Sequence, residues 1–171
     1  MFKKTILALT SISVISLSCF ASGNSHQQHK SSMSKASKKE LSTDAKRELG
    51  QLLKANEELH SAFLSYDAKM VEEKAKIVKN QIEQIKDPAI IKVLKFSGKK
   101  LGEIKASFGR DKNNENYHIF SSAFAHVLNK YDHGTEFAAY YCPMVKKNWI
   151  QKVGKVKNPY APNMVSCGGR K

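Results

Sequence analysis

The sequence predicts an all-α fold, an antiparallel four-helix bundle followed by an irregular, partly extended C-terminal wrap. Between residues 43 and 133, apolar side chains recur three and four positions apart in four successive stretches, which is the spacing of amphipathic helices. Short connections separate these stretches, and short connections favour antiparallel neighbours in a helix bundle. Beyond Gly134 the helical spacing stops, and this part holds three of the four prolines and the only tryptophan.

The chain has the size and composition of one globular domain. Its 171 residues are 41% hydrophobic and 26% charged, which is ordinary for a folded domain and excludes a collagen-like or wholly disordered chain. Three cysteines are too few for a small disulfide-dense scaffold. We therefore expect one folded domain over residues 43–171.

Residues 1–21 have the pattern of a secretory signal peptide. Two lysines precede an uncharged apolar stretch over residues 5–17, which is shorter than the roughly 20 residues that a membrane-spanning helix needs. Small side chains at Cys19 and Ala21 favour cleavage after Ala21, and the alternative is a lipoprotein acylated at Cys19. No later segment is apolar enough to cross a membrane, so we expect a periplasmic protein, exported and soluble or tethered by lipid at Cys19.

Basic residues exceed acidic ones by 29 to 15, a formal net charge of +14, and the excess lies at the two ends. Residues 22–42 are polar and rich in Ser and Lys, which predicts a disordered linker. Residues 137–171 hold seven basic residues and no acidic residue. The basic ends either keep the protein soluble or attract it to an anionic membrane surface or an acidic partner. Export argues against nucleic acid as that partner.

The first two helices are predicted from their apolar stripes. Leucines and Phe63 recur at helical spacing over residues 43–65, which predicts the first helix. From Ala68 to Ile85, apolar residues alternate three and four positions apart, which is the seam of a heptad pattern and predicts the second helix.

The last two helices are predicted from their end signals as well as their stripes. The third begins at Asp87-Pro88, because aspartate caps helix N-termini and proline suits the first helical position. Residues 109–116 contain one glycine and three asparagines and predict a turn. The fourth stripe begins at Tyr117, and Gly134 is the expected C-terminal cap.

Two short β-like runs, over residues 138–142 and 148–152, are broken by Pro, Gly and Asn and predict the irregular wrap. We expect Tyr141, Trp149 and Tyr160 to anchor the wrap across the bundle.

Two cysteines and two methionines in the wrap form the candidate metal site. Cys142 and Met144 belong to a Cys-Pro-Met segment, and Met164 and Cys167 lie three residues apart near the C-terminus. Thiolate and thioether sulfurs are soft ligands that select Cu(I). The alternative is a Cys142–Cys167 disulfide, which would close a loop of 26 residues and stabilise the fold by about 3 to 4 kcal/mol. The methionines would then fill gaps in the core. Spacing alone favours the disulfide.

The histidines are predicted from the helical projection. His126 and His133 fall opposite the apolar face of the fourth stripe, and His118 falls to one side. We expect all three to contact solvent unless the wrap covers that face. His60 falls on the apolar face of the first helix, where a buried, hydrogen-bonded histidine is favoured over a metal ligand.

Enzyme signatures are absent from the sequence. It contains no C-x-x-C redox pair, no H-E-x-x-H zinc motif, no G-x-S-x-G nucleophile motif and no phosphate-binding loop. We therefore expect a protein that is not an enzyme.

The C-terminal part resembles a family of exported bacterial domains of unknown function. That family occurs alone and at the C-termini of heavy-metal efflux membrane-fusion proteins of the copper/silver type. The resemblance rests on four features of the tail: Cys142-Pro143-Met144, Trp149, Asn158-Pro159-Tyr160 and Met164-Val165-Ser166-Cys167-Gly168. It implies a helical bundle associated with metal efflux. With this resemblance, a metal site is as well supported as the disulfide.

Together these features predict a periplasmic protein that binds or handles a heavy metal, copper above others, in association with metal efflux. A membrane-fusion protein or a pump component of an efflux system is the expected partner. The alternative is a disulfide-stapled helical adaptor that binds another cell-envelope protein and holds no metal.

Overall fold

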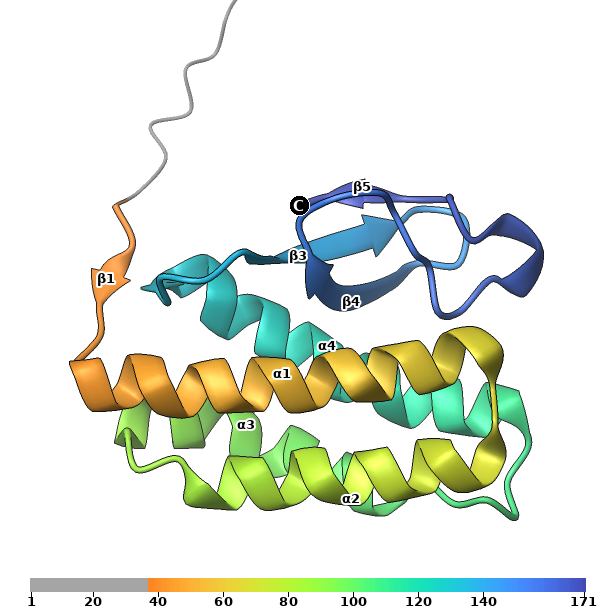
Figure 1. Cartoon of the computed structure of the whole chain (residues 1–171), viewed down its shortest axis with the longest axis horizontal. Coiled ribbons are helices and arrows are strands. Elements are labelled where there is room, and N and C mark those ends of the chain that lie inside the picture. Colours follow the sequence, from red (N-terminus) through yellow and green to blue (C-terminus); the bar gives the residue numbers. More distant parts are fainter. Residues whose placement is uncertain (1–36) are drawn as a thin grey trace, which may run out of the picture. The chain divides into compact units, whose positions relative to one another are not determined.

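The structure is a computed structural model that describes residues 37–171 (Figure 1). Four helices form most of the fold: α1 (Thr43–Ser65), α2 (Ala68–Gln84), α3 (Pro88–Gly102) and α4 (Arg110–Lys130). Each helix packs against the next one along the chain, and successive helices run in opposite directions. The predicted signal peptide, with Cys19, and the predicted linker up to residue 36 lie outside the described residues.

The predicted helix starts in the first half of the chain are confirmed. Ser42 caps α1 by accepting a hydrogen bond from the Ala45 N–H at 3.1 Å. Asp67 and Asp87 cap α2 and α3 in the same way, each accepting from two backbone N–H groups. These side chains satisfy donors that the first turn of a helix leaves unpaired. Within the described part of the chain, no helix is both long and apolar enough to cross a membrane.

Helix α4 differs from the prediction at both ends. The predicted turn over residues 109–116 is wrong, because residues from Arg110 onward are helical and three asparagines in this stretch are buried. The buried Asn113 donates to the Tyr66 hydroxyl at 3.1 Å and to the Lys105 carbonyl at 2.9 Å. These tertiary partners override the low helix propensity of asparagine.

The predicted cap at Gly134 is also wrong. Helix α4 ends at Lys130 because the next two residues form a strand, β2 (Tyr131–Asp132), that pairs in parallel with β1 (Lys39–Glu40). Strand β1 lies within the stretch predicted as linker, so the last residues of that stretch are ordered. Lys38 strengthens this junction by donating to the Leu128 carbonyl at 2.8 Å.

The C-terminal part contains a regular sheet, so the expected all-α class is corrected to mainly α with two small sheets. The larger sheet is antiparallel, with strand order β4-β3-β5, and consists of β3 (Phe137–Cys142), β4 (Lys147–Lys152) and β5 (Gly169–Arg170). Five of the six β3 residues are buried. A strand covered on both faces has no apolar–polar alternation, which is why the sequence pattern understated it.

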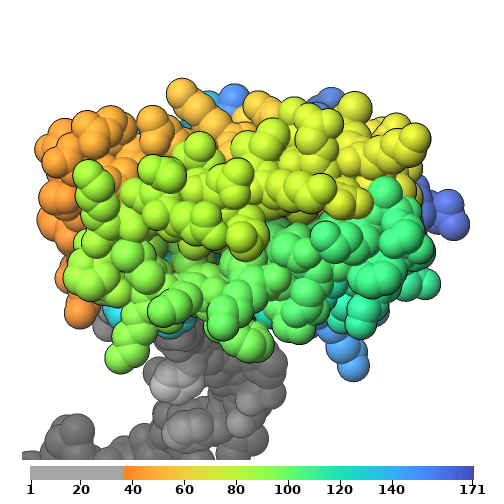
Figure 2. Space-filling view, turned by 90° about the horizontal axis from the view of Figure 1, so that it is seen from below, coloured from red at the N-terminus to blue at the C-terminus, as the bar shows by residue number. Residues whose placement is uncertain are grey.

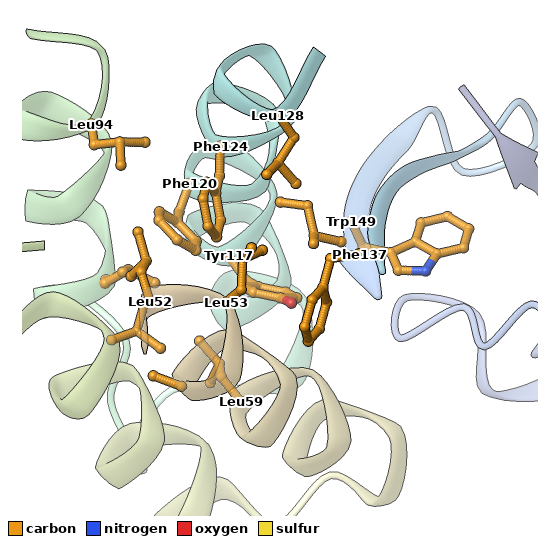
Figure 3. Packing of buried hydrophobic residues seen from close by; sticks show 14 of the residues in the cluster. Leu52, Leu53, Leu59, Leu94, Tyr117, Phe120, Phe124, Leu128, Phe137 and Trp149 are labelled. Carbon is orange, nitrogen blue, oxygen red and sulfur yellow. The ribbon is translucent and has the colours of Figure 1, made fainter. Parts of the chain in front are cut away.

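The sheet lies against α1 and α4, chiefly through β4. Alternation along the paired strands places Phe137 and Ile150 on the face toward the helices and Trp149 on the outer face. Figure 3 shows Phe137 turned toward the helices and Trp149 turned away from them. Trp149 is nevertheless fully buried, beside Tyr140 and Tyr160 at ring-centroid distances of 5.8 and 6.4 Å.

The hydrophobic core therefore extends past the sheet to its outer face. We call this part of it the outer core: Tyr140, Cys142, Trp149, Tyr160 and Cys167. The chain between β4 and β5, including a short 3-10 helix (Pro162–Met164), covers it. The predicted anchoring across the bundle is confirmed for Tyr160, whose ring centroid lies 5.8 Å from that of Tyr117 on α4. It is wrong for Trp149, which is buried on the outer face, and Tyr141 is only half-buried.

Candidate functional site

Cys142 and Cys167 come together at the edge of the outer core. Strand β5 pairs with β3 so that Gly169 lies opposite Tyr141, which brings the chain just before β5 alongside the end of β3. The two thiols lie close enough that each shifts the pKa of the other, and both cysteines are free thiols in the structure. Cys142 is fully buried and Cys167 is half-buried. One member of the pair is thus sheltered and the other is open to solvent.

Asn158 holds the Cys167 segment in place. Its side-chain amide donates to the Cys167 carbonyl at 3.0 Å, and its backbone N–H donates to the Val165 carbonyl at 2.7 Å. Its side-chain oxygen accepts from the Tyr160 N–H at 2.9 Å. Through these hydrogen bonds, Asn158 holds the Cys167 segment against the outer core.

The environment of Cys142 favours its thiolate. Burial raises the pKa of this thiol, but hydrogen bonds to its sulfur outweigh burial and leave the pKa below its usual value. The donors are the Cys167 thiol, the backbone N–H groups of Val145 and Met144, and the Asn158 side chain. The turn between β3 and β4 aims both backbone groups at the sulfur. Donors that prefer the charged form of a group stabilise it.

The second thiol ionises with more difficulty. The pKa of Cys167 is raised because its proton is shared with Cys142, because it is partly desolvated, and because the Cys142 charge repels a second negative charge. The N–H of Met144 partly offsets these effects. Protons therefore leave the pair in two separate steps, the first from Cys142.

The two methionines do not fill gaps in the core. Met144 is 66% exposed and Met164 is 40% exposed. Each lies on the same short segment as one of the cysteines, and the Met164 carbonyl accepts the Cys167 N–H at 2.8 Å. The structure thus joins the two thiols of the predicted four-sulfur site and leaves both thioethers at the neighbouring surface.

The buried histidine in α1 has the predicted structural role. His60 is buried and donates from Nε2 to the Lys157 carbonyl at 2.7 Å, since a carbonyl can only accept. Burial lowers its pKa to about 4. The ring is therefore neutral at ordinary pH and ties α1 to the segment that follows β4.

The predictions for the other histidines hold only in part. His126 is exposed, as expected. His118 is half-buried because the sheet covers it, and its Nδ1 accepts from the Asn148 N–H at 3.1 Å. His133 is buried, which contradicts the prediction, because the helical projection does not extend past Lys130.

A sulfur donor set suits soft ions. Over residues 37–171, no cluster of three or more His, Cys, Asp or Glu side chains is arranged to hold a metal. Thiolate and thioether ligands suit soft ions such as Cu(I), whereas Mg²⁺ and Ca²⁺ prefer oxygen ligands. Two adjacent thiols also fit disulfide formation, so the geometry serves both chemistries considered from the sequence.

Sequence reasoning missed the role of one positioning residue, Asn158. Asn158 was noticed only as part of a motif, and its hydrogen bonds to the Cys167 segment depend on the tertiary fold. Gly168 follows Cys167 directly and packs against the outer core. Comparisons with protein-family models, with curated proteins and with solved structures found no match for this chain.

Proposed function

We propose that the protein binds a soft metal ion of the Cu(I) type through the thiolates of Cys142 and Cys167. The pairing of β5 with β3, which brings the Cys167 segment alongside Cys142, is the observation that carries the proposal. The lowered pKa of Cys142 supports it. Metals bind the thiolate form, so a thiol that ionises readily is a ready ligand. The ion replaces the thiol protons of the pair, and binding therefore releases protons.

The exposed methionines support a role in capturing the ion. Methionine is usually among the more buried residue types, yet Met144 and Met164 are both open to solvent beside the pair. Unbranched thioether side chains adapt readily to a ligand. In the proposal, the ion first contacts the two thioethers, which then complete its coordination by sulfur.

The proposal also includes the location of the protein and its partner. The signal-peptide pattern of residues 1–21 supports a periplasmic location. The resemblance of the tail to domains joined to metal-efflux proteins supports a membrane-fusion protein or pump component as the partner. The protein acts as a carrier or buffer of the ion and not as an enzyme.

A Cu(I) competition titration tests the proposal. The full chain, reduced and kept free of oxygen, competes with a chromogenic Cu(I) chelator. We expect one Cu(I) per chain, lost in Cys142→Ser and in Cys167→Ser, and weaker binding in the double variant Met144→Leu/Met164→Leu. The matched control is Met70→Leu, which changes a methionine of similar exposure (46%) on α2. Equal affinity in the wild type and in both cysteine variants would exclude the thiol pair as the site.

A disulfide-stapled adaptor is the second candidate, and the same pairing of β5 with β3 favours it. In this case the Cys142–Cys167 bond would join β3 to the segment before β5, and the protein would bind another envelope protein without metal. Mass spectrometry of protein purified from the periplasm without reductant distinguishes the two. A chain lighter by two hydrogens, whose metal affinity stays at background after reduction, supports the adaptor. Free thiols with one bound copper support the metal protein.

A further inference from the structure

Helix α3 has a cationic face with an exposed aromatic side chain at its edge. Phe96 is 66% exposed, and Lys92, Lys95 and Lys99 are exposed beside it. At about 100° per residue, these four side chains lie within an arc of about 100° on the helix. We call them the α3 face. The helix contains no acidic residue.

The charge of this face is not neutralised by neighbours. The fourth lysine of α3, Lys100, pairs with Glu103 at 2.8 Å. The ion pairs found among residues 37–171 include none of the three lysines of the α3 face. The face therefore keeps its full positive charge beside an apolar ring.

An apolar groove borders the same face. It lies between α2 and α3, has a volume of about 330 Å³, and is lined by Ile82, Ile85 and Ile91. Its rim holds three lysines, Lys79 and the two α3-face residues Lys95 and Lys99, and one acidic residue, Glu83. Glu83 pairs with Lys79 at 2.9 Å, so Lys95 and Lys99 leave the rim with a net positive charge. An apolar floor with a cationic rim is complementary to a molecule that has a hydrocarbon part and an anionic head.

The face lies on the side of the bundle that the sheet leaves open. The sheet packs against α1 and α4, whereas α2 and α3 form the other side of the helix layer. Figure 2 looks onto this side. The thiol pair belongs to the outer core of the sheet, so the two sites lie on different sides of the helices.

We propose that the α3 face docks on an anionic phospholipid membrane. Lysines near an anionic bilayer are attracted to its headgroups, and an aromatic ring on a basic helix enters the boundary between headgroups and acyl chains. A membrane fits a convex helix face with a projecting ring, whereas an acidic protein would need a shaped partner surface. Docking in this way leaves the thiol pair facing away from the bilayer.

Sedimentation of the full chain with lipid vesicles tests the proposal. Binding is compared between vesicles of phosphatidylcholine alone and vesicles that also contain phosphatidylglycerol. We expect stronger binding to the anionic vesicles, which falls at high salt. Residues 1–36 are the same in every variant, so their contribution to vesicle binding does not affect the comparison between variants. An apolar anchor in this segment would bind vesicles of both lipid compositions.

Variants of the α3 face locate the contact. Each lysine near the surface contributes a factor of about 5, so Lys95→Gln/Lys99→Gln should weaken partitioning about 25-fold. Phe96→Ser should weaken it about tenfold. The matched control is Lys155→Gln/Lys157→Gln, which removes the same charge from exposed positions after β4, on the sheet side of the molecule.

Three outcomes would overturn the proposal. Equal binding of the wild type to both vesicle compositions would show that charge plays no part. An equal loss in the control pair and in the α3 pair would show attraction to overall charge and not to this face. Binding to an acidic polypeptide such as polyglutamate, with none to anionic vesicles, would assign the face to an acidic protein. Circular dichroism confirms that each variant is folded.

Discussion

Gly168 lies so close to Trp149 that a Cβ atom on the glycine would be 2.6 Å from Cη2 of the indole. The same atom would be 2.9 Å from the Tyr141 carbonyl oxygen, and the φ of +126° is one that L side chains rarely adopt. Gly168 connects Cys167 to β5. The close approach of backbone to ring therefore sets where the second thiol lies relative to Cys142.

Gly168→Ala should lower the free energy of unfolding by about 3 kcal/mol, because the methyl group meets a buried ring and a backbone carbonyl in a strained conformation. Urea unfolding measures this change. The matched control is Gly169→Ala, where a Cβ meets nothing within 4 Å. We expect the control to stay within about 0.5 kcal/mol of the wild type. Equal losses in both variants would contradict the packing role of Gly168.

The two cysteines should shift each other's pKa in opposite directions. Cys167→Ala removes a donor to the Cys142 sulfur and should raise the pKa of Cys142. Cys142→Ala removes the acceptor and the charge that hinder ionisation of Cys167, and should lower the pKa of Cys167. The ultraviolet absorbance of the thiolate, followed against pH, measures both. Shifts of the same sign in the two variants would refute the hydrogen bond between the thiols.

Asn158→Ala should destabilise the protein by about 2 kcal/mol or more, since it leaves the Cys167 carbonyl and the Tyr160 N–H without their partner in a buried position. It should also raise the pKa of Cys142, which loses a donor. Thermal unfolding and thiolate absorbance are the two measurements. Asn129→Ala, at an exposed position in α4, is the control and should change neither. A stable variant with an unchanged thiol pKa would show that Asn158 does not hold the Cys167 segment in place.

His60 should make the protein less stable in acid. Its pKa is about 4 in the folded protein and near 6.5 when unfolded. Between these values the unfolded chain binds a proton that the folded protein does not, so stability is complete above pH 6.5 and falls toward pH 4. The contribution is about 3 kcal/mol. Below pH 4 both states are protonated and no further loss follows.

The difference between wild type and His60→Gln isolates this effect, because glutamine keeps an N–H donor for the Lys157 carbonyl but does not titrate. Chemical unfolding at several pH values should show the wild type losing more stability than the variant between pH 7 and pH 4. Parallel pH profiles would mean that His60 is not buried in its neutral form.

The helices of the first half were predictable because their signals are local. The apolar stripe of α1 and its cap at Ser42 lie within one stretch of sequence, and the prediction of residues 43–65 is confirmed. Asp87 and Pro88 likewise mark the start of α3 by themselves. In these cases side-chain spacing and capping act between residues three or four positions apart, so no distant partner is needed.

The later elements depend on distant partners. The asparagines at the start of α4 favour a turn when considered alone, and the hydrogen bonds of Asn113 to Tyr66 and Lys105 stabilise the helix there. Strand β3 is covered on both faces, which hides its period of two. His133 is buried because α4 ends before it, at the point where β2 pairs with β1.

By itself the sequence determined the first three helices, the presence of a fourth, the identity of the sulfur-bearing side chains and the two basic ends. Only the tertiary structure decided that Cys142 and Cys167 lie in contact, with one thiol buried and the other partly open. It also decided that the methionines stay at the surface and that Phe96 stands exposed among lysines. The physical reason is that helix formation depends on neighbours along the chain, whereas contact between residues 25 positions apart depends on strand register and on the glycine that lets the backbone approach Trp149.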